Sequence, residues 1–188
     1  MNSRSNLETI IATTDDRSIV IECIMDEYGT VIKRLIFSYV KDWDIASDLT
    51  QEVFITCYEK LETFQQKSSF KTWIYRIAIN KSKDYLKSWS YRNMVLNEKI
   101  LFFKKDNNKG PDASIIDKEF STELSKIIWD LPVKYREVIL LYFYQEHTLH
   151  EISEMLTLPL STVKSRLYRG QDRIKKMYLF SDRGEQHG

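Results

Sequence analysis

The chain has 188 residues, of which 43% are hydrophobic and 29% are charged. A chain of this length and composition can bury a hydrophobic core, which excludes a wholly disordered protein. It contains only 5 glycines and 3 prolines. Because a β-sandwich needs many turns, this low number favours a mostly α-helical fold.

Cysteine usage and apolar runs narrow the class of protein further. Cys23 and Cys57 are isolated and lack CxxC spacing, so neither a disulfide framework nor a zinc site is expected. The longest apolar run, residues 138–144, is too short to span a bilayer, and no signal-peptide pattern is present. We therefore expect a cytoplasmic protein without direct membrane insertion.

Residue patterns typical of catalysis are also missing from the sequence. There is no glycine-rich phosphate loop, Ser/His/Asp arrangement or metal-ligand cluster, and His147 and His150 have no further ligands nearby. We therefore expect no enzyme activity, no metal site and no cofactor.

The net charge is only +1, but the charges are sorted along the chain. Residues 18–63 and 112–160 each have a net charge of −5, whereas residues 64–92 have +6 and residues 161–176 have +5. A polyanion could bind the two basic segments while the acidic segments face away or meet a basic protein. The alternative is solvated charge that is sorted by chance.

Two amphipathic helices are expected in the first acidic segment. Apolar residues at three- and four-residue steps predict a packing helix over residues 18–40. Asp44 is the expected N-cap of the second helix, whose inner side carries Ala46, Leu49, Val53, Cys57 and Leu61. The residues on its outer side are Asp48, Gln51, Glu52, Ile55 and Glu59. An isoleucine among carboxylates on an outward face indicates a surface on which a basic protein partner docks.

The first basic segment combines cations with aromatic residues. A polar loop at residues 65–69 leads to Ser69 as N-cap and to a helix from Phe70 to about Trp89. The residues expected on its inner side are Phe70, Ile74, Ile77, Ala78, Tyr85, Leu86 and Trp89. The outer side carries Tyr75, Arg76, Asn80, Lys83 and Lys87.

Such an outer side suits single-stranded nucleic acid, because cations neutralise phosphates and aromatic rings stack on bases. The alternative is that Trp73, Tyr75 and Trp89 are ordinary core aromatics beside a solvated charged face.

A cluster of helix breakers, KKDNNKGP at residues 104–111, predicts a linker between two domains. The second domain begins near Ile115, and its first helix is expected to end at Leu131, before Pro132 in the first turn of the next helix. The residues of that next helix expected to face inward are Tyr135, Ile139, Leu140 and Phe143.

The end of the second domain has the pattern of a helix-turn-helix. Thr148 and Glu151 form a T-x-x-E capping box for a helix through Leu156, and a turn at residues 157–160 leads to Ser161 as the next N-cap. The buried stripe of this last helix, which runs to about Tyr178, is Val163, Leu167, Ile174 and Met177 or Tyr178.

The exposed side of that helix carries Ser161, Thr162, Lys164, Ser165, Tyr168 and Arg169. These residue types, near the N-terminal end of the second helix of the motif, are typical of contacts with base edges and phosphates in the major groove. A surface helix with the same charges is the alternative.

Three segments of the sequence resemble the sigma-70 family of bacterial RNA polymerase initiation factors, in particular its small extracytoplasmic-function (ECF) group. DLTQEVF at residues 48–54 is similar to the core-polymerase-binding motif, and FKTWIYRIAINKSKDYLK at residues 70–87 to the segment that opens and reads the minus-10 element. LPVKYREVILLYFYQEHTLHEISEMLTLPLSTVKSRLYRGQDRIKK at residues 131–176 is similar to the domain that reads the minus-35 element.

The resemblance implies an all-α fold of two small helical domains. Residues 18–92 would form the sigma region 2 bundle and residues 115–179 the region 4 helix-turn-helix, joined by a flexible linker at residues 93–114. A flexible segment at residues 1–17 and a tail at residues 180–188 would flank them.

The resemblance also implies partners and contact residues. The partners are promoter DNA, an anti-sigma protein and core RNA polymerase, through the coiled coil of its largest subunit and the flap of its second-largest subunit. The outer side of the acidic helix would bind the polymerase. The implied minus-10 contacts are Phe64, Gln65, Ser68, Trp73, Tyr75, Arg76, Asn80, Lys83 and Lys87. The implied minus-35 contacts are Ser161, Thr162, Lys164, Ser165, Arg166, Tyr168 and Arg169.

Three positions depart from the family pattern. Thr157 and Ser161 stand where glycine is common, and a β-branched threonine resists a positive backbone φ. Lys87 stands where arginine is frequent, which keeps the charge but loses the bidentate fork. The expected function is promoter recognition and initiation for a specific, stress-responsive gene set. A stand-alone helix-turn-helix regulator is the alternative.

Overall fold

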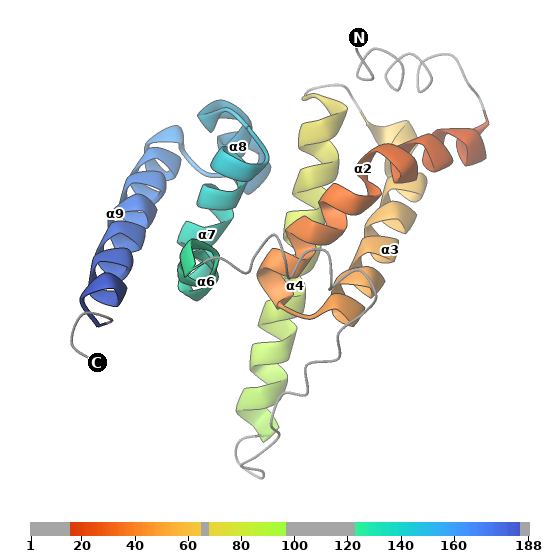
Figure 1. Ribbon diagram of the computed structural model, residues 1–188. Coiled ribbons are helices and arrows are strands. Elements are labelled where there is room, and N and C mark those ends of the chain that lie inside the picture. Colours follow the sequence, from red (N-terminus) through yellow and green to blue (C-terminus); the bar gives the residue numbers. More distant parts are fainter. Residues whose placement is uncertain (1–15, 65–67, 97–122, 185–188) are drawn as a thin grey trace. The chain divides into compact units, whose positions relative to one another are not determined.

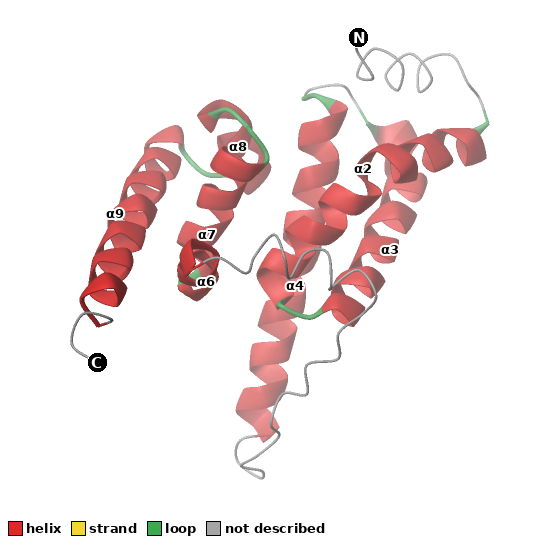
Figure 2. Ribbon diagram, viewed as in Figure 1, coloured by secondary structure: helices red, strands yellow, loops and turns green. Residues whose placement is uncertain are grey.

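The computed structural model describes residues 16–64, 68–96 and 123–184, which are helices joined by short turns (Figures 1 and 2). The chain divides into two compact units, Met1–Asn107 and Asn108–Gly188. The all-α fold is therefore confirmed. Most of the expected N-terminal segment and of the expected linker, together with residues 185–188, lies outside the described residues.

In the described part of the first unit, three α-helices each pack against the other two. They are α2 (Arg17–Val40), α3 (Trp43–Lys60) and α4 (Phe70–Leu96), and the short 3₁₀ turn η1 (Leu61–Thr63) follows α3. The core between them includes Ile24, Ile32, Ile36, Val53, Ile74 and Ala78, all of which are fully buried. The apolar spacing expected for the first two helices is thus confirmed, except that Met25, expected on the inner side of α2, is 48% exposed and Leu61 lies in η1.

Aspartates cap the first two helices. The Asp16 carboxylate accepts a hydrogen bond from the Ser18 amide at 2.9 Å. The Asp42 carboxylate accepts from the amides of Asp44 and Ile45 at 3.0 and 3.1 Å. The prediction of Asp44 as the cap of α3 was wrong, because Asp42 has the extended backbone of a cap and reaches these amides first.

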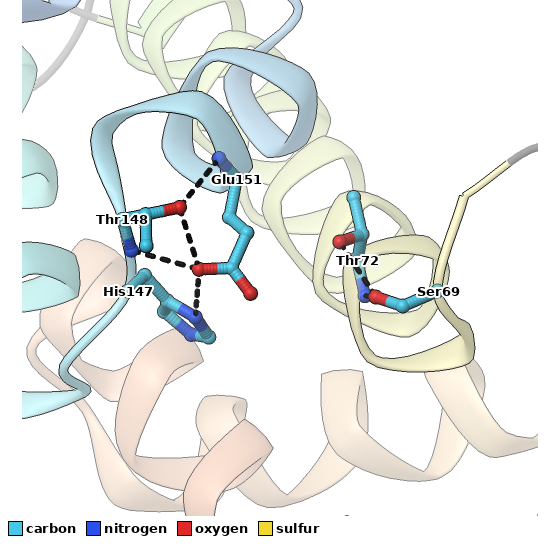
Figure 3. Close-up of polar contacts among 5 residues, drawn as sticks. All are labelled: Ser69, Thr72, His147, Thr148 and Glu151. Atoms are coloured by element: carbon cyan, nitrogen blue, oxygen red, sulfur yellow. Dashed lines mark hydrogen bonds and ion pairs between the residues drawn. The ribbon is translucent and has the colours of Figure 1, made fainter.

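Ser69 caps α4, as expected, because its hydroxyl accepts from the Thr72 amide at 3.2 Å (Figure 3). The helix continues past the expected end at Trp89 to Leu96, since residues 90–96 contain neither glycine nor proline. The C-terminal part of α4 extends beyond α2 and α3 (Figure 1). Trp89, expected in the core, is consequently 52% exposed.

The second unit contains α6 (Glu123–Asp130), α7 (Val133–Ile139), the π-helical turn η2 (Leu140–Tyr144), α8 (Leu149–Leu156) and α9 (Leu160–Gly184). Its core contains Ile128, Leu131, Ile139 and Leu140, against which Leu167, Ile174 and Met177 of α9 pack. The helix α9 continues through residues 180–184, where a tail was expected. Residues 115–122, where this domain was expected to begin, lie outside the described residues.

Two predictions near α7 were wrong. Phe143 was expected to face inward but is exposed, because each residue in the wider π-helical turn of η2 advances by a smaller angle than in an α-helix. Pro132 lies just before α7 rather than within its first turn, and its carbonyl accepts from the amides of Tyr135 and Arg136 at 2.9 and 3.1 Å.

The capping box at the start of α8 is confirmed (Figure 3). The Thr148 amide donates to Oε2 of Glu151 at 2.7 Å, and the Glu151 amide donates to the Thr148 hydroxyl at 3.3 Å. These bonds satisfy two amide donors that a helix start otherwise leaves without partners. They define where the helix-turn-helix begins.

The turn between α8 and α9 is left-handed at Thr157, with φ 54° and ψ 48°. The Leu158 amide donates to the Ser153 carbonyl at 3.0 Å, and the Ser153 hydroxyl donates to the Leu158 carbonyl at 2.6 Å. These bonds hold the turn in a geometry that a threonine resists. The strain predicted for a β-branched residue is therefore present at a position where glycine would fit better.

The helix α9 begins at Leu160, one residue before the expected N-cap Ser161. The amides of Thr162 and Val163 donate to the Pro159 carbonyl at 2.9 and 3.1 Å. Proline fixes its own φ in the helical range, so the helix can start directly after it. The prediction of Ser161 as the cap was wrong for this reason.

Replacing Thr157 with glycine should stabilise the helix-turn-helix. We expect the free energy of opening of α8 and α9 to rise by about 0.5–1 kcal/mol, because the left-handed strain relieved exceeds the entropy that glycine loses on folding. Hydrogen exchange of the α8 and α9 amides measures this change. Thr162→Gly, the same replacement within a helix, should lower that free energy by roughly 0.3 kcal/mol. Equal signs for the two variants would contradict the assignment of strain to Thr157.

Candidate docking and nucleic-acid interfaces

The outward side of α3 is acidic and has an apolar side chain at its centre. Ile55 is 58% exposed, and the surrounding Asp48, Gln51, Glu52 and Glu59 are exposed as the sequence predicted. We call these five residues the α3 face. Tyr58, three residues after Ile55, is also exposed and enlarges its apolar centre. The sequence analysis did not include Tyr58, although its helical spacing from Ile55 predicts that the two side chains lie on the same side of α3.

One carboxylate of the α3 face is already paired. Nζ of Lys81 on α4 lies 2.9 Å from Oε2 of Glu52 on α3. The two side chains are partly exposed, so water screens the pair and it contributes little to stability. A cationic partner that binds the α3 face would therefore compete with Lys81 for Glu52 at small cost.

The opposite side of α3 anchors it in the core. Ala46, Val53 and Cys57 are fully buried, and burial raises the pKa of the Cys57 thiol to about 12. The thiol therefore stays protonated at neutral pH and acts as a small apolar side chain.

Aromatic rings gather where the chain enters α4. The ring centroids of Phe64, Phe70 and Trp73 lie 5.2 to 5.5 Å from one another. Phe70 is buried, whereas Phe64 and Trp73 are only partly covered. The buried ring thus supports two partly exposed rings beside the polar loop. In that loop Ser68 is partly exposed, and Gln65 lies outside the described residues.

Tyr75 does not lie on the outer side of α4. Its side chain is 1% exposed, and burial raises the pKa of its hydroxyl well above the usual value. The prediction was wrong because α2 and α3 both pack on α4, which buries neighbouring positions such as Ile74 and Tyr75 together. A ring buried in this way cannot stack on a base, so the core interpretation holds for Tyr75.

The other outer residues of α4 form a single cationic stripe. Asn80 and Lys87 are exposed, and Arg76 and Lys83 are partly exposed. Their spacing of four, three and four residues places them along one side of the helix. We call these four residues the α4 stripe. Nζ of Lys87 lies 3.2 Å from Oδ1 of Asp84, in a pair whose two side chains are largely exposed.

The first turns of α9 present polar and cationic side chains. Ser161, Lys164, Ser165 and Arg169 are exposed, Thr162 is partly exposed, and Tyr168 is 74% exposed. We call these six residues the α9 face. Val163 between them is fully buried and holds this end of α9 on the core. The predicted arrangement of the outer and inner sides is confirmed here.

Arg166 differs from the other predicted contacts on α9. Its Nη1 lies 2.8 Å from Oε1 of Glu137 on α7, a carboxylate whose side chain is 2% exposed. Because the partner is buried, the guanidinium is turned toward α7. The sequence could not show this, since Glu137 lies 29 residues earlier in the chain.

Further cations lie near the α9 face, around Tyr135 of α7. The Lys134 ammonium and the Arg173 guanidinium each lie 5.1 Å from the centre of the Tyr135 ring. Burial acts to raise the pKa of Tyr135, but Lys134, a hydrogen bond with Arg169 and the Arg173 charge outweigh it and hold the pKa below its usual value. Sequence reasoning missed this cluster, which joins residues of two helices.

An apolar groove of about 510 Å³ lies between α6, η2 and α9. Its lining includes Leu124, Ile128, Phe143, Ile174, Tyr178 and Leu179. Most of these side chains are partly or largely exposed. The groove was not predicted, because Phe143 was expected to be buried.

Within the described ranges, no three His, Cys, Asp or Glu side chains are grouped so as to hold a metal ion. His147 is buried, with its Nδ1 at 4.0 Å from Oε2 of Glu151 (Figure 3). No helix in the described part of the chain is long and apolar enough to cross a membrane.

Two known families match this chain, one over part of each unit. The Sigma-70 region 2 family matches residues 24–90, which include the α3 face and the α4 stripe. The Sigma-70, region 4 family matches residues 122–173, which include the α9 face. The chain belongs to the sigma-70 family.

Relatives place this sigma factor in the ECF group. The ECF RNA polymerase sigma factor SigW of Bacillus subtilis (strain 168) is 31% identical over 160 residues, which cover 81% of this chain and 86% of that protein. The ECF RNA polymerase sigma-E factor of Haemophilus influenzae is 32% identical over 161 residues, covering 81% of this chain and 84% of that protein. The sigma factor is thus a transcription initiation factor that binds core RNA polymerase and promoter DNA, which replaces the alternative of a stand-alone regulator.

Solved structures show the same two-domain helical fold. The sigma factor RpoE from Bartonella quintana, in complex with the anti-sigma factor NepR, superposes with a TM-score of 0.66 at 16% identity, covering 84% of this chain and 95% of that one. CnrH, in complex with the cytosolic domain of CnrY, superposes with a TM-score of 0.65 at 17% identity, covering 93% of this chain and 96% of that one.

Tyr75 and Trp89 should respond differently to truncation. Tyr75→Ala should lower the free energy of unfolding by about 3–5 kcal/mol, because it leaves a cavity in the core of the first unit. Trp89→Ala, the matched control on an exposed part of α4, should change it by no more than about 0.5 kcal/mol. Denaturant unfolding followed by circular dichroism measures both. A loss for Trp89→Ala as large as that for Tyr75→Ala would contradict the burial described above.

Proposed function

We propose that the ECF sigma factor divides its work among three helical surfaces. The α3 face binds core RNA polymerase, the α4 stripe with Phe64 and Trp73 binds the unpaired strand of the minus-10 element, and the α9 face reads the minus-35 element. The observation that carries this proposal is the sorting of charge among the helices, acidic on α3 and cationic on α4 and α9.

The α3 face has the composition of a protein docking surface. An interface core needs apolar area, which Ile55 and Tyr58 supply, and a polar rim, which Asp48, Gln51 and Glu59 supply. Carboxylates on the rim favour a basic partner and speed its approach. We assign this surface to the coiled coil of the largest polymerase subunit. The apolar groove of the second unit suits the flap of the second-largest subunit.

The α4 stripe and the aromatic rings beside it suit unpaired DNA. Arg76, Lys83 and Lys87 can neutralise successive phosphates, while the partly exposed rings of Phe64 and Trp73 can stack on bases. Asn80 and Ser68 can form hydrogen bonds with a base edge, and Gln65 retains this role by sequence position alone. Tyr75 is omitted, because its ring is buried.

The α9 face suits a duplex. The N-terminal residues of the second helix of a helix-turn-helix enter the major groove, and here they are Ser161, Thr162, Lys164 and Ser165. Tyr168 and Arg169, one turn later, can reach a base or a phosphate. We refer to α9 as the recognition helix.

We further propose that the sigma factor acts in the cytoplasm on a stress-responsive gene set and has no catalytic activity of its own. We propose an anti-sigma protein as its regulator, since the sigma factor RpoE was solved in complex with the anti-sigma factor NepR. Such a protein would compete with the polymerase if it covered the α3 face or the apolar groove.

Reversing charge on the α3 face should weaken polymerase binding. We expect Asp48→Arg with Glu59→Arg to lower affinity for purified core RNA polymerase by at least about tenfold, because like charges would face each other in the interface. The control is Glu22→Arg with Asp26→Arg on α2, which makes the same charge change at two exposed positions. Fluorescence anisotropy with labelled sigma factor measures both. Equal losses for the two pairs would show that only net charge matters.

Cations of the α9 face should contribute to the salt dependence of promoter binding. Lys164→Met should reduce the slope of log affinity against log salt by about 0.9 for the holoenzyme on duplex promoter DNA, the value for one lost phosphate contact. Lys176→Met removes a cation about three turns further along α9, beyond the N-terminal turns that enter the major groove, and should leave the slope unchanged. Filter binding over a range of salt concentrations measures the slope. An unchanged slope for Lys164→Met would remove this residue from the DNA contacts.

A further inference from the structure

The charge of Arg166 is directed into the second unit. Its guanidinium, on a side chain that is 24% exposed, donates to the Glu137 carboxylate, which is 2% exposed. A buried carboxylate is destabilising unless a cation or several hydrogen bonds compensate it. Arg166 is therefore bound to α7 more firmly than an exposed arginine would be bound to an exposed acid.

A second close contact joins α9 to α7 one turn further on. Gly170 is buried, and a Cβ atom added there would lie 3.0 Å from Cγ1 of Ile139 and 3.6 Å from Cβ of Tyr135. Residues four apart in a helix lie on the same side. Arg166 and Gly170 thus define the side of α9 that packs on α7.

These two contacts determine where the outward side chains of α9 point. Lys164 and Ser165 precede Arg166, and Tyr168 and Arg169 follow it on the outward side. Each helical residue is turned by about 100° from the previous one, so rotating α9 on α7 would turn all four side chains away from their positions. Contacts with base edges tolerate only small displacements of this kind. The long, flexible side chains of Lys164 and Arg169 can still reach a phosphate after a small rotation, so the salt slope should not change with it.

We propose that Glu137 and Arg166 are positioning residues for recognition of the minus-35 element, and that Arg166 itself contacts neither phosphate nor base. The ion pair sets the rotation of the recognition helix on α7. This inference rests on the proposed role of α9, and it removes Arg166 from the DNA contacts that the sequence suggested.

Holoenzyme assembled from purified core RNA polymerase and sigma variants can test the inference. The probe is a promoter fragment recovered from genomic DNA with wild-type holoenzyme, compared with the same fragment after its minus-35 region is replaced. The variants are Arg166→Met, Arg166→Lys and the double variant Glu137→Met with Arg166→Met. Arg169→Met is the control for a DNA contact, because this arginine of the same helix is exposed and bonds to the Tyr135 side chain rather than to a buried carboxylate.

The expected results separate positioning from contact. Arg166→Met should reduce the affinity ratio of the two fragments by roughly tenfold, the loss of about one base contact, while the salt slope stays unchanged. Arg169→Met should lower the slope by about 0.9. The double variant should bind the two fragments with nearly the wild-type affinity ratio, because two apolar side chains can pack where the ion pair was. Arg166→Lys should give an affinity ratio between those of the wild type and Arg166→Met, because lysine keeps the charge but lacks the two-pronged guanidinium.

Three results would overturn the inference: a slope lowered by about 0.9 in Arg166→Met, an unchanged affinity ratio in that variant, or a double variant that regains nothing. If Arg166→Met does not fold, the double variant alone tests the inference. A wild-type affinity ratio for the two fragments would then support the inference, and a lost ratio would overturn it. Failure of the proposed function looks different. In that case wild-type holoenzyme would bind the two fragments equally, and the inference would fail with it.

Discussion

Packing of α4 against both α2 and α3 is the constraint on which the first unit depends. It buries two adjacent sides of α4, including Ile74 and Tyr75, and leaves the α4 stripe on the outward side. Because the core fixes the rotation of α4 from two directions, the stripe has a defined orientation without any DNA present. The same packing holds the inner side of α3 in the core, so its acidic side must face outward. One set of core contacts therefore orients two surfaces of opposite charge.

The second unit obtains a fixed recognition helix from much shorter elements. Helices as short as α7 and α8 are not stable alone in water, so end-capping and packing must hold them. The Thr148–Glu151 capping box starts α8, and the left-handed Thr157 with the bonds of Ser153 ends it. Val163, the Glu137–Arg166 pair and the close approach at Gly170 then hold α9 on the core. The geometry of the helix-turn-helix is thus set by local hydrogen bonds at its turns and by contacts across the helices.

Periodicity and capping rules predicted the helices, the two units and the outward sides of α3 and α9, because these features depend on residues within a few positions of one another. The same local rules misplaced the caps expected at Asp44 and Ser161. The direction in which a side chain faces was predicted wrongly where distant segments decide it. Tyr75 is buried because two helices cover α4, and Arg166 turns inward because Glu137 lies across from it. Phe143 is exposed because the π-helical turn changes the helical angle, which no spacing rule for α-helices includes.

Charge sorted along a sequence overstates the charge that a surface presents. Lys87 meets Asp84 and Lys176 meets Asp172 within their own helices, whereas Arg166 meets a carboxylate of another helix. These pairs differ in the burial of the acid. Exposed ion pairs contribute at most about 1 kcal/mol to stability. A DNA phosphate can therefore replace the carboxylate as the partner of the cation. A buried carboxylate such as Glu137 cannot return to water while the fold persists, so its cation stays bound to the protein. Burial of the acidic partner, more than the number of cations in a segment, therefore decides which basic residues of this sigma factor are available to the promoter.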